Sequence, residues 1–333
     1  MAAVNSCTAA LHVSLIASNV GPGDEVITTP FTFCATVNAI IHAGATPVLA
    51  DIDPLTFNID PAEVRNRLTA RTKAIVPVHF AGRPCEIKEI CKLADEFDLL
   101  VIEDCAHAIE TEVDGQKAGT FGDFGCFSFY VTKNLVTGEG GMVIGKEQVN
   151  IDRVKRLALH GMSKDAWKRF GDDGYKHYEV VECGFKYNMM DIQAAIGIPQ
   201  LAKIDTNWNR RQVVWGRYQQ AFKSLPIVCP SEPEAGTRHA YHLYTLLIDK
   251  EKCGVSRDEM LQRMTSLGIG VGVHYLSLPE HPYYQSTYGW DADEFPHAKS
   301  AGRKIMSIPL SAKLTDSEVS RVIAAVEQSL QPS

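Results

Sequence analysis

The segment Leu99-Leu100-Val101-Ile102-Glu103-Asp104 decides the fold class of this chain. Four apolar residues follow one another without a polar interruption and end directly in two acidic residues, which is typical of a strand buried on both faces. An amphipathic helix is expected just before this strand, over residues 85–97, and a β-branched apolar run over residues 73–78 precedes that helix. This alternation of strand and helix indicates a mostly parallel sheet.

The alternation continues outward from this segment toward the N-terminus. Apolar spacing and turn residues predict three further helices and two further strands, over residues 6–18, 32–43 and 62–68, and over residues 25–28 and 46–50. We therefore predict an α/β protein. Its large domain, residues 1–205, holds the mostly parallel sheet with helices on both faces.

The pattern changes beyond Gly145. A helix is expected over residues 149–159, then an irregular polar loop over residues 161–184 with Gly171-Asp172-Asp173-Gly174 at its centre, then a long helix over residues 191–225 bent at Pro199. The tail alternates again, with strands and helices predicted over residues 243–248, 257–266, 271–275 and 316–330. These elements form a smaller C-terminal α+β domain, residues 206–333.

Composition and charge exclude several classes of protein. The 333 residues carry 33 Lys+Arg against 40 Asp+Glu, a formal charge of −7, and no basic run marks a surface for nucleic acid or an anionic membrane. No apolar stretch approaches the roughly 20 residues that span a bilayer, and the first residues do not have the pattern of a signal peptide. Nine scattered cysteines without a C-x-x-C pair indicate reduced thiols in a cytoplasmic protein and no metal site.

Lys133 is the first candidate for chemistry. It follows the apolar run 126–129, and in an open α/β sheet ligands bind at the carboxyl ends of the strands. Aromatic residues precede it and Gly138-Glu139-Gly140-Gly141 follows, a setting that lowers the pKa of a lysine so that its amine can act as nucleophile and base. The alternative is an ordinary solvated lysine.

Asp104 is the second candidate. Pyridoxal phosphate (PLP) works as an electron sink while its ring nitrogen is cationic, and an aspartate at the end of a buried strand is suited to hold that nitrogen protonated. The alternative is a helix N-cap. The helix that begins at residue 6 offers an anion site for the phosphate, although ordinary capping needs the same residues. Phe31 or Phe33 would stack on the ring or belong to the core.

The order of these features along the chain carries a resemblance to a known family. It rests on the following runs: Asn5-Ser6-Cys7-Thr8-Ala9-Ala10-Leu11, Gly21-Pro22-Gly23-Asp24-Glu25-Val26, Gly44-Ala45-Thr46-Pro47-Val48, Ile102-Glu103-Asp104-Cys105-Ala106-His107, Lys133-Asn134, Gly138-Glu139-Gly140-Gly141 and Lys186-Tyr187-Asn188. In register over nearly the whole chain, they resemble the DegT/StrS-type sugar aminotransferases. The resemblance implies the aspartate-aminotransferase fold (PLP fold type I) and a homodimer.

The resemblance assigns roles around the cofactor ring. Lys133 would hold PLP as the internal aldimine and then move the proton between substrate and cofactor. Asp104 would pair with the pyridinium nitrogen, and Phe33 would stack on the ring. His107, where many relatives carry glutamine, would lie against the ring or its 3-hydroxyl.

It also assigns the phosphate and substrate contacts. The backbone at Cys7 and the hydroxyls of Thr8 and Ser128 would bind the phosphate. Asn188 would reach the phosphate held by the neighbouring subunit, so that the dimer shares its active sites. The candidates on the substrate side are His160, His274 and Tyr275.

The implied reaction is a transamination in two halves. Lysine at position 133, where dehydratases of this fold carry histidine, favours amino transfer. L-Glutamate would convert PLP to pyridoxamine phosphate, and the amine would then pass to a nucleotide-linked keto sugar. Residues 251–258 and 268–275 look most like enzymes that aminate C4, such as the 4-amino-arabinose enzyme of lipid A (lipopolysaccharide) modification. Amination at C3 is the alternative.

Three other classes remain as alternatives. A nicotinamide-dependent dehydrogenase is disfavoured because residues 119–125 and 268–270 do not form G-x-G-x-x-G. A metal enzyme would use His239 and His242, which lack a convincing ligand set. A non-catalytic PLP-binding regulator is disfavoured by the presence of both Lys133 and Asp104. Relatives carry an arm before the first helix, and we expect this chain to lack it.

Overall fold

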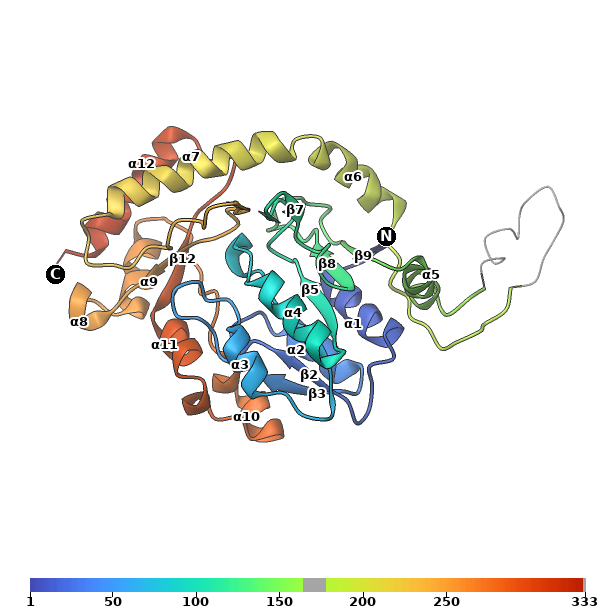
Figure 1. The fold of residues 1–333 in the computed structure, drawn as a ribbon. Coiled ribbons are helices and arrows are strands. Elements are labelled where there is room, and N and C mark those ends of the chain that lie inside the picture. The colour runs from blue at the N-terminus through green and yellow to red at the C-terminus, as the bar shows by residue number, and fades with distance from the viewer. Residues whose placement is uncertain (164–177, 332–333) are drawn as a thin grey trace.

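The computed structural model describes residues 1–163 and 178–331, and a seven-stranded sheet forms its centre (Figure 1). The sheet order is β1-β9-β8-β5-β4-β2-β3. Five strands run parallel: β2 (Glu25–Thr28), β3 (Thr46–Leu49), β4 (Thr72–Val76), β5 (Leu100–Asp104) and β8 (Phe124–Ser128). β9 (Gly141–Gly145) is antiparallel to β8, and β1 (Ala2–Val4) pairs antiparallel with β9 at the edge. The predicted mostly parallel sheet is confirmed.

Helices cover both faces of this sheet, as the uninterrupted apolar strands predicted. Ile102 packs with α1 (Cys7–Ala17), α2 (Ala35–His42) and α5 (Gln148–Leu157). Its neighbour Val101 packs with α3 (Pro61–Asn66) and α4 (Ile87–Phe97) on the opposite face. Successive residues of a strand point to opposite faces, so a strand covered twice has to be apolar at every position.

The N-terminus of α1 lies beside the carboxyl end of β5, and the local sequence explains why. The Ser6 hydroxyl accepts the backbone N–H of Ala9 and starts α1 as its N-cap. The α1 backbone passes close to β9, since a Cβ on Gly141 would lie 2.5 Å from the backbone of Ser6. The free N–H groups at the start of α1 therefore lie beside the carboxyl ends of β5 and β8.

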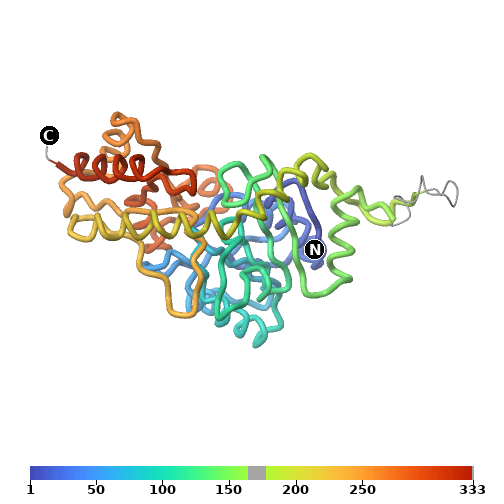
Figure 2. Tube along the Cα trace, turned by 90° about the horizontal axis from the view of Figure 1, so that it is seen from above, coloured from blue at the N-terminus to red at the C-terminus, as the bar shows by residue number. Residues whose placement is uncertain are grey.

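Much of the C-terminal part gathers at the end of the molecule away from α5, and the long helix α7 (Ile204–Phe222) reaches it from the large sheet (Figure 2). A second core forms around the antiparallel pair β11 (Tyr244–Leu247) and β12 (Ile305–Ile308). A small sheet holds β6 (Glu112–Val113), β7 (Gln116–Lys117) and β10 (Thr237–Arg238). The helices are α6 (Asp191–Leu201), α7 (Ile204–Phe222), α8 (Lys250–Cys253), α9 (Arg257–Ser266), α10 (Pro282–Tyr288), α11 (Pro296–Lys304) and α12 (Asp316–Ser329).

Two sequence expectations are wrong in this region. The predicted strand 271–275 is reduced to one bridge, in which Gly272 exchanges two backbone hydrogen bonds with Ser307 of β12. The following residues His274 and Tyr275 line the cavity described below and do not extend the pairing. The predicted continuous helix over residues 191–225 is interrupted as well. Helix α6 continues through Pro199 to Leu201, because the loss of one backbone donor near the end of a helix is tolerated. The helix is interrupted at residues 202–203, and α7 begins at Ile204.

Other expectations stay untested. The centre of the predicted long loop, Gly171-Asp172-Asp173-Gly174, lies outside the described residues. The division near residue 205 stays a prediction, and the break between α6 and α7 lies beside it. In residues 1–163 and 178–331, no helix has the length and apolar character to cross a membrane.

Candidate active site

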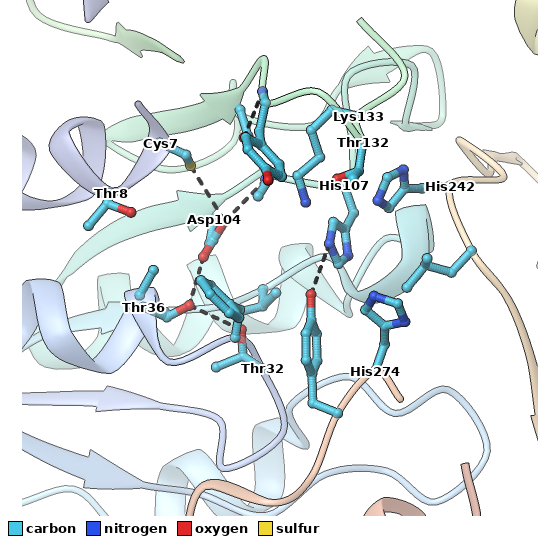
Figure 3. A pocket seen from close by; sticks show the side chains of 18 of the residues that line it. Cys7, Thr8, Thr32, Thr36, Asp104, His107, Thr132, Lys133, His242 and His274 are labelled. Atoms are coloured by element: carbon cyan, nitrogen blue, oxygen red, sulfur yellow. Dashed lines mark hydrogen bonds between the residues drawn. The ribbon is translucent and has the colours of Figure 1, made fainter. Parts of the chain in front are cut away.

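A cavity of about 730 Å³ lies where β5 and β8 end and α1 begins. Its walls come from segments far apart in sequence (Figure 3). Nine of the eleven residues singled out by sequence line it: Cys7, Thr8, Phe33, Asp104, His107, Ser128, Lys133, His274 and Tyr275. The volume is that of a pocket for a cofactor or a small molecule.

Lys133 extends its side chain into this cavity between Asp104 and His107 (Figure 3). Burial lowers the pKa of its amine, and the nearby Cys7 and Asp104 oppose that shift. In the part of the chain that the structure describes, no carboxylate forms an ion pair with it. A lysine whose pKa is lowered carries more of the neutral amine, which is the nucleophilic form.

Asp104 is the last residue of β5 and is 4 % exposed. One carboxylate oxygen accepts the hydroxyl of Thr36 at 2.8 Å, and the other accepts the backbone N–H of Ala106 at 3.1 Å. Burial raises the pKa of the carboxyl group, and these two hydrogen bonds oppose the shift. Among residues 1–163 and 178–331 no cationic side chain pairs with it, so the site fits a ligand that brings a positive charge, such as a protonated pyridine ring.

The start of α1 provides an anion site beside this carboxylate. Ser6 satisfies the N–H of Ala9, which leaves the preceding N–H groups of the first turn for a ligand. Thr8 is exposed on the cavity wall, and the Ser128 hydroxyl lies at the end of β8. Hydroxyl groups and free N–H groups at a helix N-terminus fit a phosphate.

The structure separates the two aromatic candidates for ring stacking. Phe31 is fully buried and packs against Phe57 and Phe80 in the core. Phe33 is 58 % exposed and lines the cavity, with its ring centroid 6.1 Å from that of Tyr275. Only Phe33 is therefore available to a ligand.

His107 is held as a neutral ring with a defined tautomer. Its Nδ1 accepts the backbone N–H of Ala81 at 3.3 Å, so its Nε2 carries the hydrogen and donates to the Tyr275 hydroxyl at 3.2 Å. Burial, then the charge of Lys133, holds the pKa of His107 well below its usual range. The hydroxyl hydrogen of Tyr275 is left free to donate to a ligand.

Two of the predicted residues lie outside the cavity. Asn188 bridges to Val4, its amide nitrogen donates to the carbonyl of Met189 at 3.4 Å, and its Oδ1 is buried without a partner in the described residues. His160 sits in a turn with φ of 59°, and its backbone N–H donates to the carbonyl of Phe185. Neither side chain lines the cavity.

Sequence reasoning missed Thr36 and the position of His242 at the cavity. The only sequence signal for Thr36 is its distance of four residues from Thr32, whose hydroxyl lies 3.0 Å away. The disfavoured metal pair of His239 and His242 does not share a site, because only His242 lines the cavity. Nδ1 of His239 accepts a hydrogen bond from the backbone N–H of Tyr241. His242 instead belongs to the wall next to His107.

A buried cluster behind the cavity supports the end of β5. Glu103 accepts the backbone N–H groups of Gly119, Phe121 and Gly122 and contacts Nε2 of His79 at 3.0 Å. Cys105 completes a group of ligand atoms close enough to hold a metal ion, but both carboxylate oxygens already accept hydrogen bonds. The cluster therefore fastens the loop before β8 to β5.

The lysine and the buried carboxylate in one cavity, at the carboxyl ends of a mostly parallel sheet, define a PLP-dependent aminotransferase of fold type I. The sequence profile of the DegT/DnrJ/EryC1/StrS aminotransferase family matches residues 1–327, and the chain belongs to this family. Its cofactor is PLP.

Three relatives agree with this assignment. The spore coat polysaccharide biosynthesis protein SpsC of Bacillus subtilis is 47 % identical over 326 residues, which cover 97 % of this chain and 84 % of that protein. The aminotransferase TlmJ from Streptoalloteichus hindustanus has a TM-score of 0.89 at 32 % identity, covering 99 % of this chain and 85 % of its own. The putative sugar aminotransferase Spr1654 from Streptococcus pneumoniae, in its PLP form, has a TM-score of 0.89 at 31 % identity, covering 99 % and 86 %. The enzyme transaminates sugars.

Proposed function

We propose that this enzyme moves the amino group of L-glutamate onto the keto group of a nucleotide-linked sugar, at C4. The observation that carries the proposal is that Lys133 and Asp104 lie in one cavity and that neither forms an ion pair among the described residues. An amine of lowered pKa and a buried carboxylate that needs a cation are the two groups that transamination requires. The C4 preference rests on the sequence likeness of residues 251–258 and 268–275.

The side chains divide the work as follows. PLP, when bound, supplies the electron sink. The Nζ atom of Lys133 would hold the cofactor and would carry a proton to and from the substrate carbon. Asp104 keeps the proton on the ring nitrogen, and Phe33 and His107 orient the ring.

The phosphate and the substrates take the remaining groups. The first turn of α1, with Cys7 and Thr8, and the hydroxyl of Ser128 hold the phosphate. His274 and Tyr275 are on the wall contributed by the C-terminal part and contact the sugar. His160 lies outside the cavity, so a contact with the substrate has no support from this chain alone.

We also propose that the enzyme is a homodimer in which Asn188 serves the partner's cofactor. Helix α6 has no buried residue, and four of its apolar side chains are exposed: Ile192 (73 %), Ile196 (43 %), Ile198 (73 %) and Leu201 (56 %). The Oδ1 atom of Asn188, which is buried and has no hydrogen-bond partner in residues 1–163 and 178–331, lies next to this helix in sequence. Exposed apolar side chains on two sides of a helix, next in sequence to a buried polar atom without a partner in the described residues, fit coverage by a second copy of the chain.

The cell compartment and pathway belong to the same proposal. All nine cysteines are unpaired, and they would stay reduced in the cytoplasm. The name of SpsC refers to a coat polysaccharide. This supports an amino sugar destined for a surface polysaccharide such as lipopolysaccharide.

A spectrum and a substrate panel test the proposal. The purified protein with PLP should be yellow, borohydride should fix the cofactor on Lys133 as read by peptide mass spectrometry, and L-glutamate should bleach the colour. Nucleotide-linked 4-keto sugars should then restore it faster than 3-keto sugars. A dehydrogenase would show no PLP absorbance, and a regulator would bind PLP but leave its spectrum unchanged by glutamate.

A further inference from the structure

A line of buried polar side chains connects helix α7 to the active-site cavity. Arg211 of α7 forms an ion pair with Glu110, and the two side chains are 4 % and 1 % exposed. Glu110 accepts a hydrogen bond from the amide nitrogen of Asn134 at 2.9 Å, and Oδ1 of Asn134 lies 3.0 Å from Nδ1 of His242. Asn134 directly follows Lys133 in sequence, and His242 lines the cavity.

A buried ion pair is not in itself evidence of a stabilising role. Burial raises the pKa of Glu110 and lowers that of Arg211, because both charges have left water. A buried ion pair of this kind is often replaced by apolar side chains without loss of stability. The hydrogen-bonded connection from this pair to His242 on the cavity wall runs through Asn134.

The neighbours of Asn134 permit one orientation of its amide group. The nitrogen donates to Glu110 and to the backbone carbonyl of Ala240 at 3.0 Å, so both of its hydrogens are used. The reverse orientation would place Oδ1 against two groups that only accept hydrogen bonds. Oδ1 therefore faces His242, and Nδ1 of His242 must carry the hydrogen that it donates.

The consequence is a lone pair on Nε2 of His242. Within residues 1–163 and 178–331 no group donates a hydrogen bond to that atom. The ring stands beside His107 on the cavity wall, with the two centroids 4.3 Å apart (Figure 3). His107 has the opposite tautomer, and its Nε2 hydrogen is taken up by the Tyr275 hydroxyl. The wall therefore presents Nε2 of His242 as an acceptor and the hydroxyl of Tyr275 as a donor.

We propose that Nε2 of His242 accepts a hydrogen bond from a hydroxyl group of the sugar, and that Arg211, Glu110 and Asn134 are positioning residues for it. The inference rests on the proposed function. A neutral acceptor suits a hydroxyl donor and repels the oxygens of a carboxylate or a phosphate, which offer lone pairs of their own. His242 thus selects the sugar rather than the amino donor or the nucleotide phosphates.

The first test reads the tautomer without any catalysis. Apo-protein with ¹⁵N-labelled histidine rings is examined by long-range ¹⁵N–¹H NMR, and the His242 signal is assigned by its loss in His242→Gln. We expect a neutral ring with hydrogen on Nδ1. Asn134→Leu should abolish that preference. Asn38→Leu, which removes a similar hydrogen bond to Tyr284, should leave it intact. Hydrogen on Nε2 in the unaltered protein overturns the inference.

The second test reads substrate recognition. Glutamine at position 242 can place an acceptor near the position of Nε2, whereas asparagine reaches only the position of Nδ1. UDP- and dTDP-linked 4-keto-6-deoxyhexoses with and without the 2- or 3-hydroxyl serve as probes. Loss of one hydroxyl should lower kcat/KM of the unaltered enzyme about tenfold to a hundredfold. His242→Asn should erase that difference, and His242→Gln should keep part of it.

The outcomes separate this inference from the proposed function. If each deoxy sugar loses the same factor in the unaltered enzyme and in His242→Asn, the role of His242 is refuted even though transamination stands. If His242→Asn lowers kcat/KM for L-glutamate more than for the sugar, His242 serves the amino donor and the inference is also refuted. If no keto sugar is turned over, the proposed function fails, and the NMR measurement still decides the tautomer.

Discussion

The hydrogen bond from Thr36 to Asp104 offers a sharp test of how the cofactor site works. Thr36→Val keeps the shape of the side chain and removes the hydroxyl that donates to the carboxylate at 2.8 Å. A hydrogen bond to a charged group contributes about 1.5–3 kcal/mol, and Thr36 and Asp104 are both buried. The ionised form of Asp104 should become less stable by that amount.

PLP binding should weaken in proportion, because the ring nitrogen pairs with the ionised carboxylate. An energy of about 1.5–3 kcal/mol corresponds to a rise in Kd of about tenfold to 150-fold. The measurement is a titration of apo-protein with PLP followed by tryptophan fluorescence, together with the rate of bleaching by L-glutamate.

A matched variant controls for the change in packing. Thr36→Ser keeps the hydroxyl and loses the methyl group, and it should bind PLP within about threefold of the unaltered protein. Circular dichroism should show that all three proteins are folded. If Thr36→Val binds PLP as tightly as Thr36→Ser and bleaches at the same rate, the hydrogen bond does not control Asp104 and the reasoning is refuted.

Three further predictions concern the lysine, the carboxylate and the apolar helix. Lys133→Ala should lose all reaction with L-glutamate while its circular dichroism spectrum is unchanged; measurable turnover in this variant contradicts the role of Lys133. In the apo-protein the folded-state pKa of Asp104 is raised, so its contribution to stability is present at acid pH and is lost as pH rises through that pKa. The Tm of apo Asp104→Asn should therefore exceed that of the unaltered apo-protein by more at pH 8 than at pH 4, and a difference that does not change with pH contradicts the assigned direction. Ile198→Glu should convert the dimer to monomer in sedimentation, at a cost to association on the order of 2 kcal/mol or more, whereas Val149→Glu, which changes an equally exposed side chain on α5, should not.

The sheet and its two central functional residues were predictable because their signals are local. A strand buried on both faces has to be apolar at every position, and the run that ends at Asp104 shows this directly. The ends of strands in a parallel sheet share one edge, so Asp104 and Lys133 were expected to meet. The Ser6 cap likewise follows from one residue type at one place.

The rest of the site depends on contacts between segments far apart in sequence. Asn134 meets His242 across more than a hundred residues, and no pattern in either segment encodes that contact. The hydroxyl of Thr36 matters only because α2 packs where β5 ends. Residues 271–275 look like a strand by composition, but only Gly272 pairs with β12, and His274 and Tyr275 line the cavity instead.

The neighbouring acids Glu103 and Asp104 show what this architecture implies for mutational tolerance. Glu103 needs its full length to reach three backbone N–H groups, and Asp104 needs to be short enough to leave room in front of its carboxylate. The two side chains have the same charge and are neighbours in sequence. Exchanging them would nevertheless release the loop before β8 from Glu103 and place a longer side chain in the cavity in front of Asp104. A saturation library of this strand should therefore reject even the most conservative acid-for-acid replacement at both positions, for two unrelated reasons.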